Sequence, residues 1–133
     1  MRDKLFADTN VLLYLLSDDV HKKSCAKDIL LTYPLISTQV INEFSNVCIR
    51  KLKLPADQLL KALNGIEQFT TITQSTISTT RKAIHLQSRY QLQYYDSLII
   101  ATALENGCDI LYSEDMQHGL VIDGQLKVVN PFN

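Results

Sequence analysis

The sequence has no excess of positive charge, which limits the partners that it could attract by charge alone. Its 133 residues include 13 Lys and Arg against 14 Asp and Glu, a formal net charge of −1. Without a global positive field, a nucleic acid would have to be held by a local basic patch. Hydrophobic residues make up 46% of the chain, which is typical of a globular protein. We expect a single domain over residues 1–133, because this length suffices for one sizeable core and not for two.

The chain also lacks the features of exported, membrane-spanning and zinc-binding proteins. Asp8 and Asn10 interrupt the apolar start and no small-residue cleavage site follows, so we expect no signal peptide. No apolar run approaches the length of a membrane span. Cys25, Cys48 and Cys108 fit no zinc spacing, and the three histidines share no ligand spacing. We therefore expect a reduced, cytoplasmic protein with thiols in its core.

What the chain does have is a regular alternation of short apolar segments and longer helical patterns. The expected strands cover 4–8, 34–38, 70–73, 109–113 and 126–130. The expected helices cover 10–17, 18–33, 39–52, 55–69, 75–92 and 93–107. The helix over 97–104 has almost no polar side, so it should be buried. No repeat or linker interrupts this order, which predicts an α/β fold with a mainly parallel central sheet of four to five strands.

Four acidic residues occupy related positions in this pattern. Asp8 ends the first strand, Glu43 lies one turn into the helix after the second, Asp96 leads into the buried helix, and Asp115 follows the strand over 109–113. Ligands of such sheets bind at the carboxyl ends of the strands, so the four side chains can converge there. Clustered carboxylates repel each other unless a cation intervenes. An oxygen-rich set without His or Cys favours Mg²⁺ or Mn²⁺.

Each acid has a simpler interpretation when it is taken alone. Asp96 could be a helix N-cap, Asp8 a turn or cap residue, Glu43 a solvated helix flank and Asp115 part of a polar turn. The metal-site hypothesis therefore depends on their joint placement. Glu114 adjoins Asp115, and spacing alone does not say which of the two is the ligand.

Three segments carry a resemblance to a known family: "FADTNVLLYLL", "QVINEF" and "YYDSLIIATALENGCDILYSEDMQHG". In this order they resemble the acidic blocks of PIN domains, and the size of the chain is similar to that of VapC-type toxins of toxin–antitoxin pairs. The resemblance implies a three-layer α/β/α domain that cleaves structured RNA, such as a tRNA or rRNA loop, with Mg²⁺ or Mn²⁺. It also implies a homodimer, a cognate antitoxin, and the following site residues: Asp8, Glu43, Asp96 and Asp115 as catalytic metal ligands, with Thr9, Asn10 and Ser113 in support. The segment "SEDMQHG", the last block, departs from the commoner family pattern after the strand over 109–113.

Local charge and aromatic residues could supply the contacts to RNA. Arg50, Lys51 and Lys53 form a basic cluster just past the helix of Glu43, although such clusters are also common on solvated faces. Tyr94 and Tyr95 could stack on a splayed base, or pack in the core.

Other functions that begin with an aspartate after the first strand fit less well. A dehalogenase-like phosphatase needs a second Asp where Asn10 stands, and a receiver domain needs an acid at the end of its middle strand, which "TTIT" lacks. The alternative from another class is a catalytically silent PIN-like module that docks protein or RNA. Four acids that repel each other argue against it.

Overall fold

Six strands form one sheet in the computed structural model, which describes residues 3–133. The strands are β1 (Leu5–Ala7), β2 (Leu35–Ser37), β3 (Thr71–Thr73), β4 (Ile110–Tyr112), β5 (Val121–Ile122) and β6 (Leu126–Val129). Their order across the sheet is β3-β2-β1-β4-β6-β5, and every pairing is parallel except that of β5 with β6. The predicted α/β class and mainly parallel sheet are confirmed, but the sheet has six strands instead of four to five.

The additional strand is β5, which forms a hairpin with β6. The residues from Asp123 to Gln125 connect the two strands. Asp123 and Gly124, with positive φ angles of 53° and 67°, are the central pair of a tight turn in which the Gln125 N–H donates to the carbonyl of Ile122. Positive φ at both central residues characterises the tight turns of two-residue hairpins, and Asp-Gly is a favoured pair for them. The Asp-Gly pair is visible in the sequence as a turn signal, but a strand of only two residues gives no periodic signal of its own.

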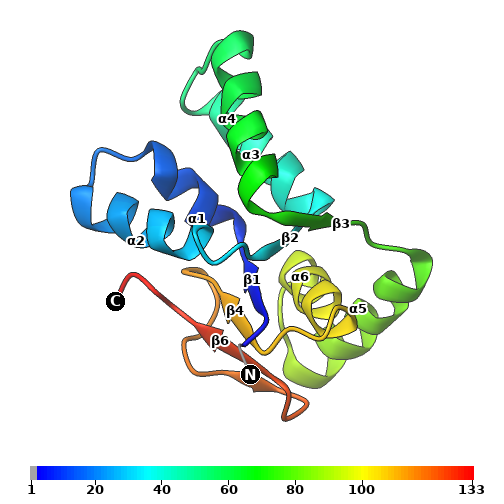
Figure 1. Cartoon of the computed structure of the whole chain (residues 1–133). Coiled ribbons are helices and arrows are strands. Elements are labelled where there is room, and N and C mark those ends of the chain that lie inside the picture. The colour runs from blue at the N-terminus through cyan, green and yellow to red at the C-terminus, as the bar shows by residue number, and fades with distance from the viewer. Residues whose placement is uncertain (1–2) are drawn as a thin grey trace.

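Helices cover both faces of the sheet. They are α1 (Thr9–Leu13), the short 3-10 helix η1 (Tyr14–Leu16), α2 (Val20–Leu30), α3 (Thr38–Arg50), α4 (Ala56–Phe69), α5 (Ile77–Tyr90) and α6 (Tyr94–Glu105). In Figure 1, α1 and α2 lie on one side of β1 while α5 and α6 lie on the other, in agreement with the expected three layers. The C-terminal end approaches α2, where the Cys25 thiol donates to the carbonyl of Pro131 and the Phe132 ring packs edge-on against Tyr14.

The core lies between the sheet and these helices. Its largest fully buried side chains include Phe6, Leu12, Ile36, Phe44, Ile99, Ile100 and Leu111. Helix α6 contributes a continuous buried segment from Ile99 to Leu104, which confirms the expectation for this nearly all-apolar helix. Asn106 ends it and Gly107 follows with a φ of 71°, a conformation that glycine adopts without strain.

The strand order places the carboxyl end of β1 at the centre of one sheet edge. Strand β1 pairs with β2 on one side and with β4 on the other. After β1 the chain continues to β2, and after β4 it continues to β5 and β6, so the two connections run in opposite directions. Such a reversal is the point at which open α/β sheets bind ligands. Within residues 3–133, no helix has both the length and the apolar composition needed to cross a membrane.

Candidate active site

Asp8 sits at this central point and is almost completely buried. It directly follows β1, and its carboxylate caps α1 by accepting a hydrogen bond from the Thr9 N–H at 2.7 Å. Its other oxygen accepts from the Ser113 hydroxyl at 2.8 Å, and its own N–H donates to the carbonyl of Tyr112. Asp8 is thus both a helix cap and part of a polar junction between β1 and the end of β4.

Thr9 connects Asp8 to Glu43. While the Thr9 N–H donates to Asp8, its hydroxyl donates to Glu43 Oε2 at 2.9 Å. The second oxygen of Glu43, Oε1, accepts from Gln39 Nε2 at 2.8 Å. Glu43 lies in the second turn of α3, which begins directly after β2. Both oxygens of Glu43 are therefore held by neutral donors, and each retains lone pairs for a further partner.

Asp96 is the third residue of α6, so the simple interpretation of this residue as the helix cap is wrong. Gln93 occupies the cap position, and its side chain makes no capping bond. Burial raises the pKa of Asp96, and the nearby Asp115 and Glu43 carboxylates raise it further. These couplings show that α6 brings Asp96 to the same edge as the acids that follow β2 and β4.

The surroundings of Asp8 disfavour its charged form. Burial raises the pKa of Asp8 from 3.8 to about 6, against the two hydrogen bonds that lower it, and repulsion from Glu43 and Asp96 adds to the rise. The ion pairs found within residues 3–133 join other groups, Lys22 with Glu114 and Arg89 with Asp123. No basic side chain in this part of the protein therefore neutralises the acidic edge.

Glu114 and Asp115 have different environments although they are neighbours. The Glu114 carboxylate accepts hydrogen bonds from the Tyr14 hydroxyl and from Lys22 Nζ, which also lies 4.6 Å from the centre of the Tyr14 ring. Asp115 is exposed and acts on the pKa of Asp96. Glu114 thus fastens the loop after β4 to η1 and α2, while Asp115 faces the acidic edge.

The remaining predicted residues differ in how close they come to this site. Ser113 is fully buried against Asp8, whereas the Asn10 side chain makes no hydrogen bond with any residue from 3 to 133. The basic cluster Arg50, Lys51 and Lys53 is exposed at the end of α3 and in the turn toward α4. An α-helix rises about 1.5 Å per residue, so this basic cluster begins roughly 10 Å along α3 from Glu43.

Sequence reasoning missed Gln39, whose amide nitrogen also donates to the backbone carbonyl of Tyr95 at 3.2 Å. This residue therefore links α3 to the first turn of α6. A signal was present, because Gln39 lies four residues before Glu43, and residues at this spacing share a helix face.

Comparisons with known proteins give a consistent result. The family model of the PIN domain matches residues 5–119. A toxin–antitoxin complex from Klebsiella pneumoniae is 25% identical, with 96% of this chain and 97% of the other covered and a TM-score of 0.72. At lower identity, two further structures show the same fold. The toxin VapC20 of Mycobacterium tuberculosis, which cleaves the sarcin–ricin loop, is 15% identical over 84% of this chain and 90% of its own, with a TM-score of 0.65. A DNA-bound VapBC complex from Salmonella typhimurium is 16% identical over 96% of this chain and 98% of its own, with a TM-score of 0.68. A search of curated protein sequences gave no significant match.

Proposed function

The chain belongs to the PIN domain family, and from this membership we propose that it is a divalent-metal-dependent endoribonuclease, the toxin of a type II toxin–antitoxin system. One observation carries the proposal. Asp8, buried at the switch point of the sheet with a pKa raised to about 6, shares its edge with three further carboxylates and with no neutralising side chain of the described chain.

The donor set fits Mg²⁺ or Mn²⁺. Among residues 3–133, no three His, Cys, Asp or Glu side chains are gathered closely enough to hold an ion by themselves, so waters and a substrate phosphate would have to complete its coordination. Magnesium commonly binds in this way, through one or two carboxylates, several waters and the phosphates of a substrate. Asp8, Asp96 and Asp115 would hold the ion, and Glu43 would bind the ion or its water. When bound, the ion would neutralise the scissile phosphate and lower the pKa of a water.

The chain's own residues would arrange this chemistry. Ser113 and the Thr9 N–H fix the Asp8 carboxylate, and the Thr9 hydroxyl and Gln39 fix Glu43, so neither acid needs to reorganise when a phosphate arrives. Asn10 is proposed to support the site. The reaction would be an in-line hydrolysis that leaves a 5′-phosphate and a 3′-hydroxyl.

The environments of Glu114 and Asp115 favour Asp115 as the last ligand, and paired substitutions test this assignment. Asp115→Asn should lower kcat/KM at least about 10- to 100-fold, the usual cost of losing even an outer partner of a metal site. Glu114→Gln retains an acceptor for Tyr14 and loses only a partly exposed ion pair, so we expect a loss below about 10-fold. Steady-state cleavage of one RNA by both variants provides the measurement. The reverse order of effects would make Glu114 the ligand.

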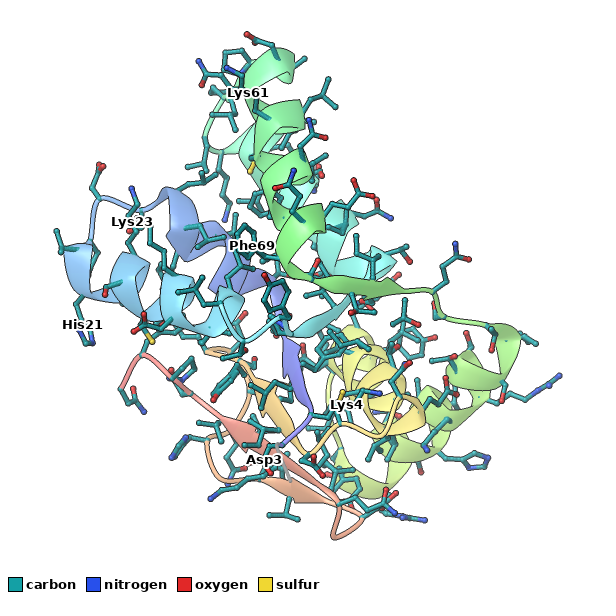
Figure 2. The ribbon with its side chains drawn as sticks, in the orientation of Figure 1. Asp3, Lys4, His21, Lys23, Lys61 and Phe69 are labelled. Atoms are coloured by element: carbon teal, nitrogen blue, oxygen red, sulfur yellow. The ribbon has the colours of Figure 1, made fainter. Side chains whose placement is uncertain are left out.

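The exposed cluster Arg50, Lys51 and Lys53 is proposed to hold the RNA backbone. Lys51→Ala should weaken binding more at low salt than at high salt, and should reduce the slope of log K against log[salt] by about 0.7. Binding to single-stranded RNA, measured in chelator over a range of salt concentrations, would show this. Lys23→Ala is the matched control, since Figure 2 shows Lys23 on α2, away from the turn that follows α3. Equal losses at all salt concentrations would exclude the cluster from RNA binding.

Further proposals concern assembly. We propose that the protein is one nuclease domain, acts in the cytoplasm, forms a homodimer, and is blocked by an antitoxin that covers the acidic edge. The solved toxin–antitoxin complexes of similar fold support an antitoxin partner.

An apolar hollow of about 220 Å³ lies between α4 and the α1–α2 region and gives such a partner a place to anchor. It is lined by Leu12, Leu16, Phe44, Ile66 and Phe69 among others, and Figure 2 places Phe69 where α4 faces α1.

Cleavage of total cellular RNA by the purified chain tests the proposed function. In Mg²⁺ or Mn²⁺ we expect a few discrete cuts with 5′-phosphate ends, and in EDTA we expect none. Mapping the fragment ends would identify the RNA. Absence of metal-dependent cutting, from protein shown to be folded and free of antitoxin, would favour the docking module instead.

A further inference from the structure

A hollow opens directly beside the acidic edge and shares a wall with it. It has a volume of about 470 Å³, within the range of ligand pockets. Its lining comes from the start of α3, the loop before α5 and the first turn of α6: Thr38, Gln39, Asn42, Glu43, Ser75 and Tyr95. Because Glu43 belongs both to this lining and to the acid cluster, a ligand in the hollow would adjoin the reacting phosphate.

The chemistry of the lining restricts what the hollow can bind. These six residues include one carboxylate and no Lys, Arg or His, so the hollow is unsuited to a phosphate group. Apart from one aromatic ring, they offer hydroxyls and side-chain amides and no large aliphatic group. An aromatic surface combined with neutral donors and acceptors suits a flat, uncharged, polar ligand. A nucleobase has these properties.

Tyr95 supplies the aromatic surface, and its ring contacts a neighbouring ring. The residue is 59% exposed although it lies on a helix adjacent to Asp96. The neighbouring Tyr94 ring, itself packed against the core, contacts it edge-on with centroids 5.3 Å apart. The Tyr95 carbonyl accepts from Gln39. Single-stranded bases stack on exposed aromatic rings of this kind.

Gln39 adds an independent sign that a ligand completes the hollow. Its amide nitrogen donates both to Glu43 and to the Tyr95 carbonyl. Turning the amide over would set its oxygen against these two acceptors, so the orientation is determined. Gln39 Oε1 is then a buried acceptor that lacks a partner among residues 3–133. Such groups are rare in folded proteins, and each nucleobase has an N–H donor on its pairing edge.

We propose that this hollow binds the nucleobase next to the scissile phosphate, with Tyr95 as the stacking surface and Gln39 and Asn42 as the residues that read the base edge. The proposal rests on the proposed ribonuclease function and adds the source of its base preference. Asn42 is exposed beside Glu43 and makes no side-chain hydrogen bond within the described part of the chain, so its amide is free to pair with a base.

The test uses the full chain with Mn²⁺ and a pool of RNA hairpins whose loops are randomised. Cut sites are sequenced, and kcat and KM are measured on the preferred hairpin. Tyr95→Ala should raise KM about 5- to 150-fold, the range for one base stack, with a smaller change in kcat. It should also flatten the base preference at one position beside the cut. Tyr95→Phe should retain both properties, and Asn42→Ala should alter the preference at the same position.

The control is Tyr33→Ala, which removes another largely exposed tyrosine, 62% exposed, from the opposite sheet edge just before β2. It should behave like the wild type. If the wild type cuts RNA and both Tyr95→Ala and Asn42→Ala retain its KM and base preference, the base site is overturned and the ribonuclease stands. If Tyr95→Ala does not fold, Asn42→Ala decides alone. If the folded wild type cuts no RNA, the ribonuclease proposal fails and the base site fails with it.

Discussion

Asp96→Asn should lower RNA cleavage at least about 100-fold and leave the protein folded. Loss of an outer partner of a metal site already costs about 10- to 100-fold, and a direct ligand should cost no less. The substitution breaks no hydrogen bond of the Asp96 carboxylate within residues 3–133, because Gln93 holds the cap position of α6. It also removes a charge whose pKa is raised by burial and by the neighbouring Asp115 and Glu43. The loss should therefore be chemical and not structural.

The measurement is kcat/KM in saturating Mg²⁺ or Mn²⁺, together with thermal unfolding of the same preparation. Asp57→Asn is the matched control, because Asp57 is an exposed acid in the first turn of α4. It should cleave like the wild type. Wild-type activity in Asp96→Asn would remove this residue from the metal site.

Asp8→Asn should make the metal-free protein more stable at pH 7, although it should abolish RNA cleavage. The folded protein raises the pKa of Asp8 from 3.8 to about 6, so between about pH 4 and pH 6 the folded state keeps a proton that the unfolded chain has released. Stability therefore falls as pH rises through this window. The shift corresponds to roughly 3 kcal/mol. Asn carries no charge and keeps an acceptor for the Thr9 N–H, so it escapes most of this cost.

Chemical unfolding in EDTA at pH 4, 5 and 7 would test this second prediction. The advantage of Asp8→Asn should be greatest at pH 7 and should nearly vanish at pH 4, where the wild-type carboxyl is protonated in the folded state. Adding Mn²⁺ at pH 7 should reverse the order, because only the wild type gains free energy from binding the ion. A variant less stable than the wild type at pH 7 in EDTA would contradict this electrostatic account.

The sequence predicted those features for which a residue pattern indicates a single structure. The alternation of short apolar segments with helical patterns predicted the parallel strands, and the nearly all-apolar composition of 97–104 predicted that α6 is buried. The end of the first apolar segment predicted that Asp8 lies at the carboxyl edge of the sheet. The two-residue strand β5 gave no pattern, so the sheet was predicted with too few strands. Neighbours in the sequence were harder to separate. The roles of Glu114 and Asp115 are distinguished by their surroundings. Tyr14 and Lys22, which donate to Glu114, come from distant segments of the chain, so the sequence does not show this contact.

The surroundings of the individual acids, and with them the raised pKa of Asp8, could not be predicted from the sequence either. Asp96 could have been a cap or a site residue until the start of α6 was located at Tyr94. The fixing of Glu43 by Thr9 and Gln39 depends on how α1 and α3 approach each other. The raised pKa of Asp8 depends on its burial. These properties arise from packing, which periodicity does not encode.

Anomalous diffraction from crystals grown with Mn²⁺ would test most directly whether the four acids form a divalent-cation site. A peak is expected roughly 2.1 Å from carboxylate oxygens of Asp8 and Asp96, on the side that Asp115 and Glu43 face. The peak should be absent from Asp8→Asn crystals grown in the same way. A peak bound elsewhere, or one that persists in Asp8→Asn, would show that the four acids do not form the cation site.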